Sequence, residues 1–385
     1  MYILGFETSC DETAAAVVKD GREILSNVVV SQIDIFKEYG GVIPEVAARS
    51  HLEAILPVVE KALKDANLTW TEIDSLAVTH TPGLLGSLLI GTLTARTLAI
   101  LHNKPLYAVH HLKSHIYANW LSDNQPEFPL LALVVSGGHT QIIRMTAHNQ
   151  FEIIGTTRDD AVGECFDKVA KILGLPYPGG PSISKAAKDG DPHKYHFPHP
   201  KLSSPIRPSI KTALNKNLPS SHSSKTPPLS LDFSFSGLKT AVLREVQKAV
   251  GKPISYPSHE LKNLLTKQQI NDFAASFENT ATDILIENLQ KALRENPDTK
   301  SICLAGGVSA NDPLREKSRT VFLPDKSLSG DNGAMVAAAA FYEIESGVQP
   351  TDPYSVSLAP RSAIDRPLGR GKPKAYSPLG RYNFS

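Results

Sequence analysis

The sequence predicts an α/β protein made of two similar halves that face a cleft. The stretch "YILGFETS" (2–9) is a short strand that ends in polar residues, and the next stretch continues as further strands. The same order of strand, polar turn and strand returns in "FPLLALVVSGGHTQIIRM" (128–145). A chain of 385 residues is too long for one ordinary core, so two domains are expected. The apolar (41%) and charged (21%) fractions are typical of a globular protein and exclude disordered and fibrous classes.

In the first half, predicted strands alternate with helices. "TAAAVVKDGREILSNVVV" predicts two strands joined by a turn at Asp20-Gly21. Apolar residues recur at helical spacing from Pro44 to about Ala66, and "DSLAVTHTPG" predicts a strand before a long helix from about Leu85 to His102. "PLYAVHH" then predicts a strand that leads into residues 110–120.

In the second half, "DDAVGECFDKVAKILGL" (159–175) predicts an amphipathic helix, and "SICLAGGVSAND" (301–312) predicts a strand and a glycine turn before another helix. Residues 190–231 and the tail after Gly347 lack periodicity, so we expect neither to build a core. We therefore place one domain at 1–125 and the other at 126–347, interrupted by a flexible insertion at about 190–231. A basic extension containing Pro and Gly follows at 348–385.

Charge and cysteine content restrict the function further. Forty Lys and Arg residues nearly cancel 39 Asp and Glu residues, so no global positive field indicates nucleic acid, although a local basic face stays possible. Cys10, Cys165 and Cys303 are odd in number and far apart, which favours a reducing cytoplasm over a disulfide framework. The apolar stretch 84–101 is interrupted by Gly residues and Arg96, so it predicts a buried helix and no membrane span. The N-terminus lacks the character of a targeting segment.

Turns follow predicted strands around Thr8–Glu12, which consists of small and polar residues, and at Ser136–His139 and Gly306-Gly307, which each contain a Gly pair. A further Gly pair precedes a helix in "YPGGPSISKAAK" (177–188). Glycine allows backbone N–H groups to approach phosphates, and helix N-termini favour anions. A single Gly-Gly turn is usually only a tight connection, but four turns of this kind in one chain, three of them with a Gly pair, predict nucleotide binding. The sequence contains neither a Walker A motif nor a GxGxxG fingerprint.

The stretch "HHLKSHIYANW" (110–120) places His111 and His115 one helical turn apart. Such a pair is more often a surface or capping pair than a metal site, and a site needs a third ligand. Asp331 in "GDNGAM" is the best candidate for that ligand. The absence of HExxH excludes the zinc metalloprotease motif. His110 and Lys113 are predicted to be solvated or structural neighbours.

The charges on the helix at 159–175 allow two interpretations. Glu164, Asp167 and Lys168 are typical of a solvated helix face. Asp167 could instead reach a ribose hydroxyl if this helix borders the cleft.

These pieces resemble one family closely. "LGFETSCDET", "GGVIPEVAARSH", "HHLKSH", "LVVSGGHTQ", "GECFDKVAKILGLPYPGGP", "FSFSGLKT", "LAGGVSAN" and "DNGAM" occur in the order of the TsaD family of tRNA adenosine threonylcarbamoyltransferases. The resemblance covers about residues 1–189 and 232–347, and "CDET" and "SGGHT" are similar to bacterial or organellar members. It implies the actin, Hsp70 and sugar-kinase (ASKHA) fold, in which two duplicated mixed-sheet domains enclose a nucleotide cleft.

The resemblance also implies a reaction and its components. The threonylcarbamoyl group of L-threonylcarbamoyl-AMP is transferred to N6 of adenosine 37, in tRNAs reading codons that begin with A, forming N6-threonylcarbamoyladenosine (t6A). The implied partners are the tRNA anticodon loop, a TsaB-like paralogue, a TsaE-like ATPase and an upstream threonylcarbamoyl-AMP synthase. The implied ligands of one divalent metal ion, iron or zinc, are His111, His115 and Asp331. The implied adenylate contacts are Val134, Val135, Ser136, Gly137, Gly138, Asp167, Gly180 and Asn311, with Ser184 as a further candidate where some relatives have an acidic residue.

The chain departs from the family pattern before "DN", where Ser329 and Gly330 replace the usual Cys and Thr or Asp; Asp331 itself is intact, so only the geometry that flanks it is expected to differ. For catalysis, we expect Glu12, supported by Asp11, to take the proton from the attacking adenosine amine or to orient that amine. Cys10 is the alternative as a nucleophile. However, the adenylate is already activated, and the two adjacent carboxylates disfavour the Cys10 thiolate.

Two other classes of function are considered. One is a carbamoyltransferase of the same superfamily that acts on a small molecule, which "FSFSGLKT" and "GECFDK" argue against. The other is a non-catalytic scaffold subunit, which the paired histidines argue against.

Overall fold

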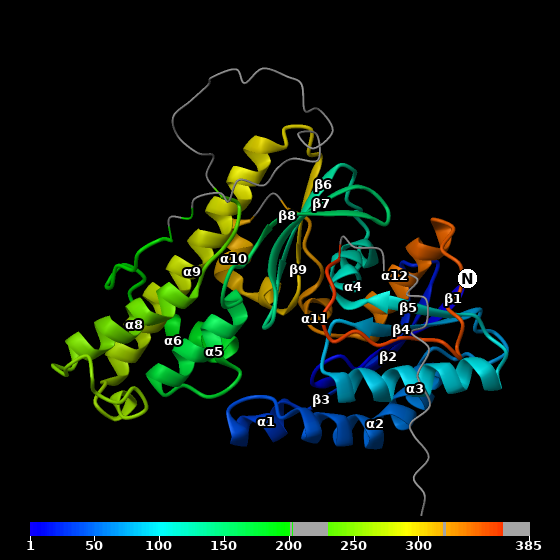
Figure 1. Cartoon of the computed structure of the whole chain (residues 1–385), viewed down its shortest axis with the longest axis horizontal. Helices are drawn as coiled ribbons and strands as arrows, with labels where there is room; N and C mark the ends of the chain where they lie inside the picture. Colours follow the sequence, from blue (N-terminus) through cyan, green and yellow to red (C-terminus); the bar gives the residue numbers. More distant parts are fainter. Residues whose placement is uncertain (201, 203–229, 319–320, 365–385) are drawn as a thin grey trace, which may run out of the picture.

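The computed structural model describes residues 1–200, 202, 230–318 and 321–364, and it contains two mixed β-sheets (Figure 1). In each sheet, an inner strand pairs antiparallel with the strand that directly follows it in the chain and parallel with a strand from later in the chain. Because the strand order and direction agree in the two sheets, the predicted repeat is confirmed. The first sheet has the order β3 (Glu23–Ser31), β2 (Glu12–Lys19), β1 (Tyr2–Glu7), β4 (Ser75–Thr81), β5 (Leu106–His110), and the second β8 (Gln150–Thr156), β7 (Thr140–Ala147), β6 (Leu130–Val135), β9 (Ser301–Ala305).

The first sheet is covered by helices on both faces. Asp20 and Gly21 adopt positive φ angles of 51° and 68°, which confirms the predicted turn between β2 and β3. One face packs against α2 (Pro44–Asp65) and α3 (Leu85–Leu101), and α1 (Ile33–Tyr39) precedes them. The other face packs against α12 (Gly333–Glu345). Both faces of β2 are therefore buried, which explains its continuous apolar run.

Helix α3 is only partly buried. The stretch 84–101 was expected to form a buried helix, yet Leu85, Leu89 and Leu93 are 56%, 42% and 42% exposed. The expectation is wrong for this outer face because only one side of α3 packs on β4 and α2. In the part of the chain that the structure describes, no helix is both long and apolar enough to cross a membrane.

The second sheet packs against a separate group of helices. These are α5 (Val162–Leu173), α6 (Gly179–Ala187), α8 (Ser236–Ala249) and the long α9 (Lys267–Glu295), which lie together in Figure 1. Helix α9 begins with a capping box, in which the Thr266 side chain accepts from the backbone of Gln269 and the Gln269 side chain accepts from the backbone of Thr266.

The chain returns to the first sheet after completing the second. Helix α12 (Gly333–Glu345) packs on the face of β1 and β2 opposite α2 and contacts α4 (His111–Tyr117). One buried cluster consequently contains residues of both sheets, such as Ile3 and Leu130, together with residues of α12 such as Ala337. The predicted domain boundary at 125/126 lies in the connection that precedes β6, and the division into domains stays a prediction.

Parts of the two segments that were expected to lie outside any core are buried. Phe197 is 7% exposed within the core of the second half, and Tyr195 stacks on Phe273 with ring centroids 3.7 Å apart. Ile364 is 2% exposed in the cluster shared by both sheets. The expectation is therefore wrong for these positions, because single apolar side chains without periodicity still fill gaps in the core. The remainder of the predicted insertion (201 and 203–229) and of the extension (365–385) lies outside the described residues.

Candidate active site

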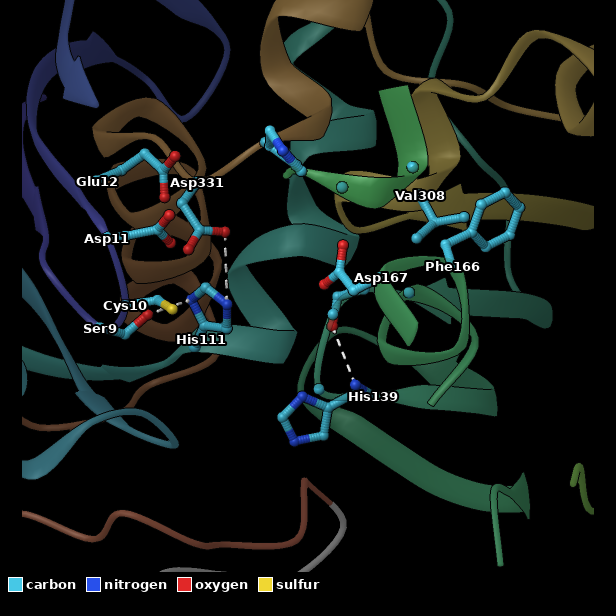
Figure 2. A pocket seen from close by; sticks show the side chains of 18 of the residues that line it. Ser9, Cys10, Asp11, Glu12, His111, His139, Phe166, Asp167, Val308 and Asp331 are labelled. Atoms are coloured by element: carbon cyan, nitrogen blue, oxygen red, sulfur yellow. Dashed lines mark hydrogen bonds and ion pairs between the residues drawn. The ribbon is translucent and has the colours of Figure 1, made fainter. Parts of the chain in front are cut away.

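A cavity of about 770 Å³ lies between the two halves and is large enough for a nucleotide-sized ligand. All four turns singled out in the sequence contribute to its wall. Figure 2 shows Asp11, Glu12 and Asp331 on one side, with Asp167 and His139 on the other. The predicted site residues that line it are Asp11, Glu12, His111, Ser136, Gly137, Gly138, Asp167, Gly180, Ser184, Asn311 and Asp331.

The glycine turns leave open space toward the cavity. A Cβ atom added at Gly137, Gly138, Gly180 or Gly307 would meet no other atom within 4 Å. The turn at Ser136 is tight, because its backbone N donates to the carbonyl of His139 at 2.8 Å. Open backbone of this kind can approach a phosphate or ribose closely.

Helix α5 approaches this turn through Gly163. A Cβ added at Gly163 would lie 2.6 Å from the backbone oxygen of Ser136, so only glycine allows this distance. One turn later, Asp167 lines the cavity and its Oδ1 accepts from the backbone N of Gly179 at 2.7 Å. Burial raises the pKa of Asp167. Asp167 is therefore a cavity residue that also holds the start of α6, not part of a solvated helix face.

Ser184 and Asn311 meet at a carboxylate that sequence reasoning missed. Oε1 of Glu278 accepts from Oγ of Ser184 at 2.5 Å and from Nδ2 of Asn311 at 2.6 Å. Glu278 is 4% exposed in the middle of α9, and burial raises its pKa. Its position in a helix without strong periodicity offered no signal. Val134 and Val135 differ from the other predicted contacts, because both are fully buried in β6 and neither lines the cavity.

His111, His115 and Asp331 converge as the sequence predicted. His111 is the first residue of α4, His115 follows one turn later, and Asp331 stands just before α12. Their candidate ligand atoms all lie within 4.8 Å of one another. Oδ1 of Asp331 is 3.0 Å from Nε2 of His115 and 3.6 Å from Nε2 of His111. Two imidazoles and one carboxylate form a suitable ligand set for a divalent transition metal.

Two further observations favour a metal ion at this position. Glu7, which is fully buried, lies 3.0 Å from Nδ1 of His111, so the opposite nitrogen, Nε2, is left to face Asp331. Both ring nitrogens of His115 are buried without a hydrogen bond of regular geometry to any described residue, although Nε2 is close to Asp331. A buried polar atom without such a bond is costly, and a cation bound at Nε2 would satisfy it.

The electrostatics of the site are dominated by carboxylates. Burial opposes the charge on His111, but Asp331 and Glu7 outweigh it and raise the pKa of His111 to about 9. Burial also opposes the charge on Asp331, yet the neighbouring His111 and His115 hold its pKa well below the usual range. Burial together with the charges of Asp331 and Asp11 raises the pKa of Glu12 far above its ordinary value. This concentration of carboxylates favours the binding of a cation.

Cys10 lies beside this cluster. Burial, followed by the charges of Asp11 and Asp331, raises the pKa of Cys10 well above its ordinary value. The expectation that the local carboxylates disfavour the thiolate is confirmed, with burial as the larger cause. The geometry thus favours a non-nucleophilic Cys10.

The departures before Asp331 leave its turn well supported. Ser329 is buried and its Oγ accepts from Arg315 at 3.1 Å. Asn332 caps α12 by accepting from the backbone N of Met335 at 3.0 Å. His110 and Lys113 are structural neighbours, as expected. His110 caps α4, and Lys113 lies 3.7 Å from Glu343.

His139 and Arg361 are among the cavity residues that were not identified from the sequence as site residues. Burial lowers the pKa of His139 to about 4, so its imidazole is neutral. Arg361, from the C-terminal segment, also lines the cavity. The "SGGHT" motif was a signal for His139, whereas the tail composition offered none for Arg361.

Comparisons with known proteins agree with this geometry. The profile of the TsaD family, described as tRNA N6-adenosine threonylcarbamoyltransferase, matches residues 23–338. A protein of that name from Symbiobacterium thermophilum is 46% identical over 355 residues, covering 90% of this chain and 93% of the relative. Another from Listeria monocytogenes is 46% identical over 347 residues, covering 88% and 90%. The crystal structure of full-length HypF in its phosphate- and nucleotide-bound form covers 89% of this chain and 46% of that chain, with a TM-score of 0.50 and 14% identity, and it shows the fold alone.

Proposed function

We propose, since the chain belongs to the TsaD family of tRNA N6-adenosine threonylcarbamoyltransferases, that its cleft transfers a threonylcarbamoyl group from L-threonylcarbamoyl-AMP to N6 of adenosine 37 in tRNA. The product is t6A in tRNAs that read codons beginning with A. The observation that carries this proposal is one cavity that joins open glycine turns to the His111, His115 and Asp331 cluster.

In the transfer, the N6 nitrogen forms a bond to the carbamoyl carbon and the bond from that carbon to the AMP phosphate oxygen breaks. AMP leaves with the bonding electron pair, and the amine loses one proton. The donor is already an activated mixed anhydride, so the protein's task is positioning, charge stabilisation and proton acceptance.

We assign adenylate binding and proton acceptance to different residues of the cavity. The turns at Ser136–Gly138 and Gly180, with Asp167, Ser184 and Asn311, hold the adenylate, and Glu278 holds Ser184 and Asn311 in place. Val134 and Val135 support the turn from within β6. Glu12, with Asp11, takes the proton from the adenosine amine or orients it, because both carboxyl groups line the cavity next to Asp331. A cation held by Asp331 would offset the negative charge that raises the pKa of Glu12, and it would thereby favour the ionised carboxylate that a base requires.

We propose iron or zinc as the metal, because two imidazoles and a carboxylate suit both ions. His111, His115 and Asp331 would hold a divalent cation, which would supply positive charge able to polarise the donor carbonyl. Metal analysis by mass spectrometry tests the site. The double variant His111→Ala and His115→Ala is expected to lose the bound metal and the activity while retaining its fold. Unchanged metal content with full activity would rule out the site.

We further propose that the enzyme acts with a TsaB-like paralogue and a TsaE-like ATPase, downstream of a threonylcarbamoyl-AMP synthase. The exposed apolar side chains of neighbouring helices α2 and α3, Leu52, Leu56, Leu85, Leu89 and Leu93, offer the paralogue a docking surface. We place the reaction in the cytoplasm, because all three cysteines are free thiols.

The proposed reaction is tested directly by mass spectrometry of tRNA nucleosides. Unmodified tRNA is incubated with threonine, bicarbonate, ATP, the partner enzymes and this protein. We expect t6A to appear only when this protein is present. Formation of no t6A by a metal-loaded, folded enzyme with active partners would refute the proposed function.

A further inference from the structure

The last described segment of the chain, residues 351–364, reaches the cavity from the far end of the first sheet. We call it the C-terminal strap. It begins beside β5, where the backbone N of Thr351 donates to the carbonyl of Leu106 at 2.7 Å and Oγ1 of Thr351 accepts from the backbone N of Ala108 at 3.2 Å. The strap therefore extends the edge of the first sheet before it turns toward the site.

The strap is attached to the end of β4 close to the cavity. Oγ1 of Thr81 donates to the carbonyl of Ala359 at 2.5 Å, and the backbone N of Ala359 donates to the carbonyl of His80 at 3.3 Å. The backbone N of Gly83 donates to the carbonyl of Pro360 at 3.2 Å. On the other side, Ile364 is 2% exposed in the core. These contacts hold the backbone on both sides of Arg361.

Arg361 is a cationic residue in a cavity wall that is otherwise rich in carboxyl groups. The described residues that line the cavity include five carboxyl side chains but no other arginine and no lysine (Asp11, Glu12, Asp167, Asp312, Asp331). Arg361 is exposed, and it forms no hydrogen bond or ion pair with any described residue. The strap thus presents a guanidinium to an acidic cleft without pairing it to any of these carboxylates.

The proposed reaction, on which this inference rests, brings phosphate groups into that cleft. A phosphate monoanion is repelled by the carboxylates and needs a cation to compensate its charge. The planar guanidinium donates two parallel hydrogen bonds to phosphate oxygens, and it stays charged at all relevant pH values. An arginine without a protein partner can form these bonds without breaking an existing ion pair.

We propose that Arg361 is a phosphate-binding residue of the active site, delivered by the C-terminal strap. The phosphate belongs either to the adenylate or to the backbone of the anticodon loop. Both sources offer the same chemistry, a singly charged phosphate with two free oxygens. Measuring the affinity for AMP and the affinity for tRNA separately distinguishes them.

The test compares Arg361→Ala and Arg361→Lys with Arg294→Ala, an exposed arginine at the end of α9 that does not line the cavity. Affinity for AMP is measured by calorimetry on the metal-loaded enzyme, and affinity for unmodified tRNA is measured by filter binding at several salt concentrations. Thermal melting confirms that each variant is folded. The Arg294→Ala variant is expected to behave as wild type in every measurement.

We expect Arg361→Ala to weaken one of the two affinities about tenfold or more, with partial recovery in Arg361→Lys. Loss of AMP affinity alone assigns the adenylate phosphate. Loss of tRNA affinity alone, with a salt dependence reduced by about one phosphate contact, assigns the tRNA backbone. Wild-type affinities for both ligands would overturn the inference. The binding measurements need no turnover. Wild-type affinities in the Arg361 variants would therefore contradict only the role of Arg361 and leave the proposed reaction intact. Conversely, a failure of the wild-type enzyme to form t6A would contradict the proposed reaction without affecting the measured affinities.

Discussion

At the scale of single residues, Glu7 shows how a buried carboxylate can prepare a metal ligand. It accepts from the backbone N of Ser9 and from Oγ1 of Thr79, each at 2.6 Å, and it lies 3.0 Å from Nδ1 of His111. These bonds hold the carboxylate in one orientation, and the carboxylate in turn orients the imidazole. Glu7 is thus a positioning residue for the proposed metal site.

We predict that Glu7→Gln weakens metal binding about 10- to 100-fold, because an amide orients His111 less strongly than a carboxylate. Competition with a chelator, followed by metal analysis, measures the affinity. The Cys10→Ser variant, which keeps the Glu7 and His111 pair, is the control and is expected to bind metal normally. Wild-type affinity in folded Glu7→Gln would contradict the positioning role.

Cys10 and Glu12 are neighbours with different expected roles. We predict that Cys10→Ser keeps most of the transfer activity, because the raised pKa of Cys10 leaves little thiolate. Glu12→Ala is expected to lose about 10²- to 10⁴-fold in transfer rate, the usual effect of removing a general base, while adenylate binding is largely retained. Single-turnover transfer measures both.

A threonylcarbamoyl adduct trapped on Cys10 would refute direct transfer to the tRNA. So would a folded Cys10→Ser variant without activity. A Glu12→Ala variant that transfers at the wild-type rate would remove Glu12 from the mechanism.

At the scale of secondary-structure elements, the contact of α12 with β1 positions Asp331. A Cβ added at Gly5 would lie 2.4 Å from the carbonyl oxygen of Gly333, and one added at Gly333 would lie 2.5 Å from the backbone N of Ala16. Helix and sheet therefore touch through their backbones. Asp331 is two residues before Gly333, so this contact determines how far the carboxylate lies from His111.

We predict that Gly333→Ala destabilises the protein by about 1–3 kcal/mol, because α12 must move away from the sheet. The variant should also bind metal more weakly, since Asp331 moves with the helix. Gly237→Ala in α8 is the matched control, because a Cβ there meets no other atom within 4 Å, and it should be neutral or slightly stabilising. Thermal melting and metal analysis measure both effects, and equal melting temperatures for the two variants would show that the contact yields easily.

At the scale of the whole molecule, the apolar surface on α2 and α3 lies on the first half, away from the helices of the second half (Figure 1). Leu52 and Leu56 of α2 are 65% and 53% exposed, next to the exposed leucines of α3. Apolar side chains gathered on one face are typical of a protein interface. None of the five leucines that form this surface lines the cavity, so binding of a partner to them is compatible with catalysis.

We predict that Leu89→Glu abolishes association with the TsaB-like paralogue, because a charge in an apolar interface is costly. The free protein should keep its melting temperature, since Leu89 is already 42% exposed. Ile254→Glu is the control, because Ile254 is 69% exposed in the second half and outside the proposed surface. Analytical ultracentrifugation with the paralogue measures association, and complex formation by Leu89→Glu would place the interface elsewhere.

Local sequence determined most of the elements and half of the metal site. Strands, turns and the α2 and α3 helices follow from apolar spacing and from residues such as Asp20 and Gly21, which depend on their immediate neighbours. The His111 and His115 pair is likewise a property of one helical turn. The long α9 was not predicted, because polar residues such as Asn271 and Ser276 interrupt its apolar spacing and are buried against residues 190–195.

Only the tertiary structure decided which distant residues meet. Asp331 reaches the histidines because α12 returns to the first sheet, and Glu278 of α9 reaches Ser184 in α6 and Asn311 at the start of α10 (Asp312–Lys317). Arg361 reaches the cavity because isolated contacts hold an otherwise polar tail. Local patterns report the conformational preferences of neighbouring residues, whereas these meetings depend on how whole elements pack, and that packing free energy is summed over the entire core.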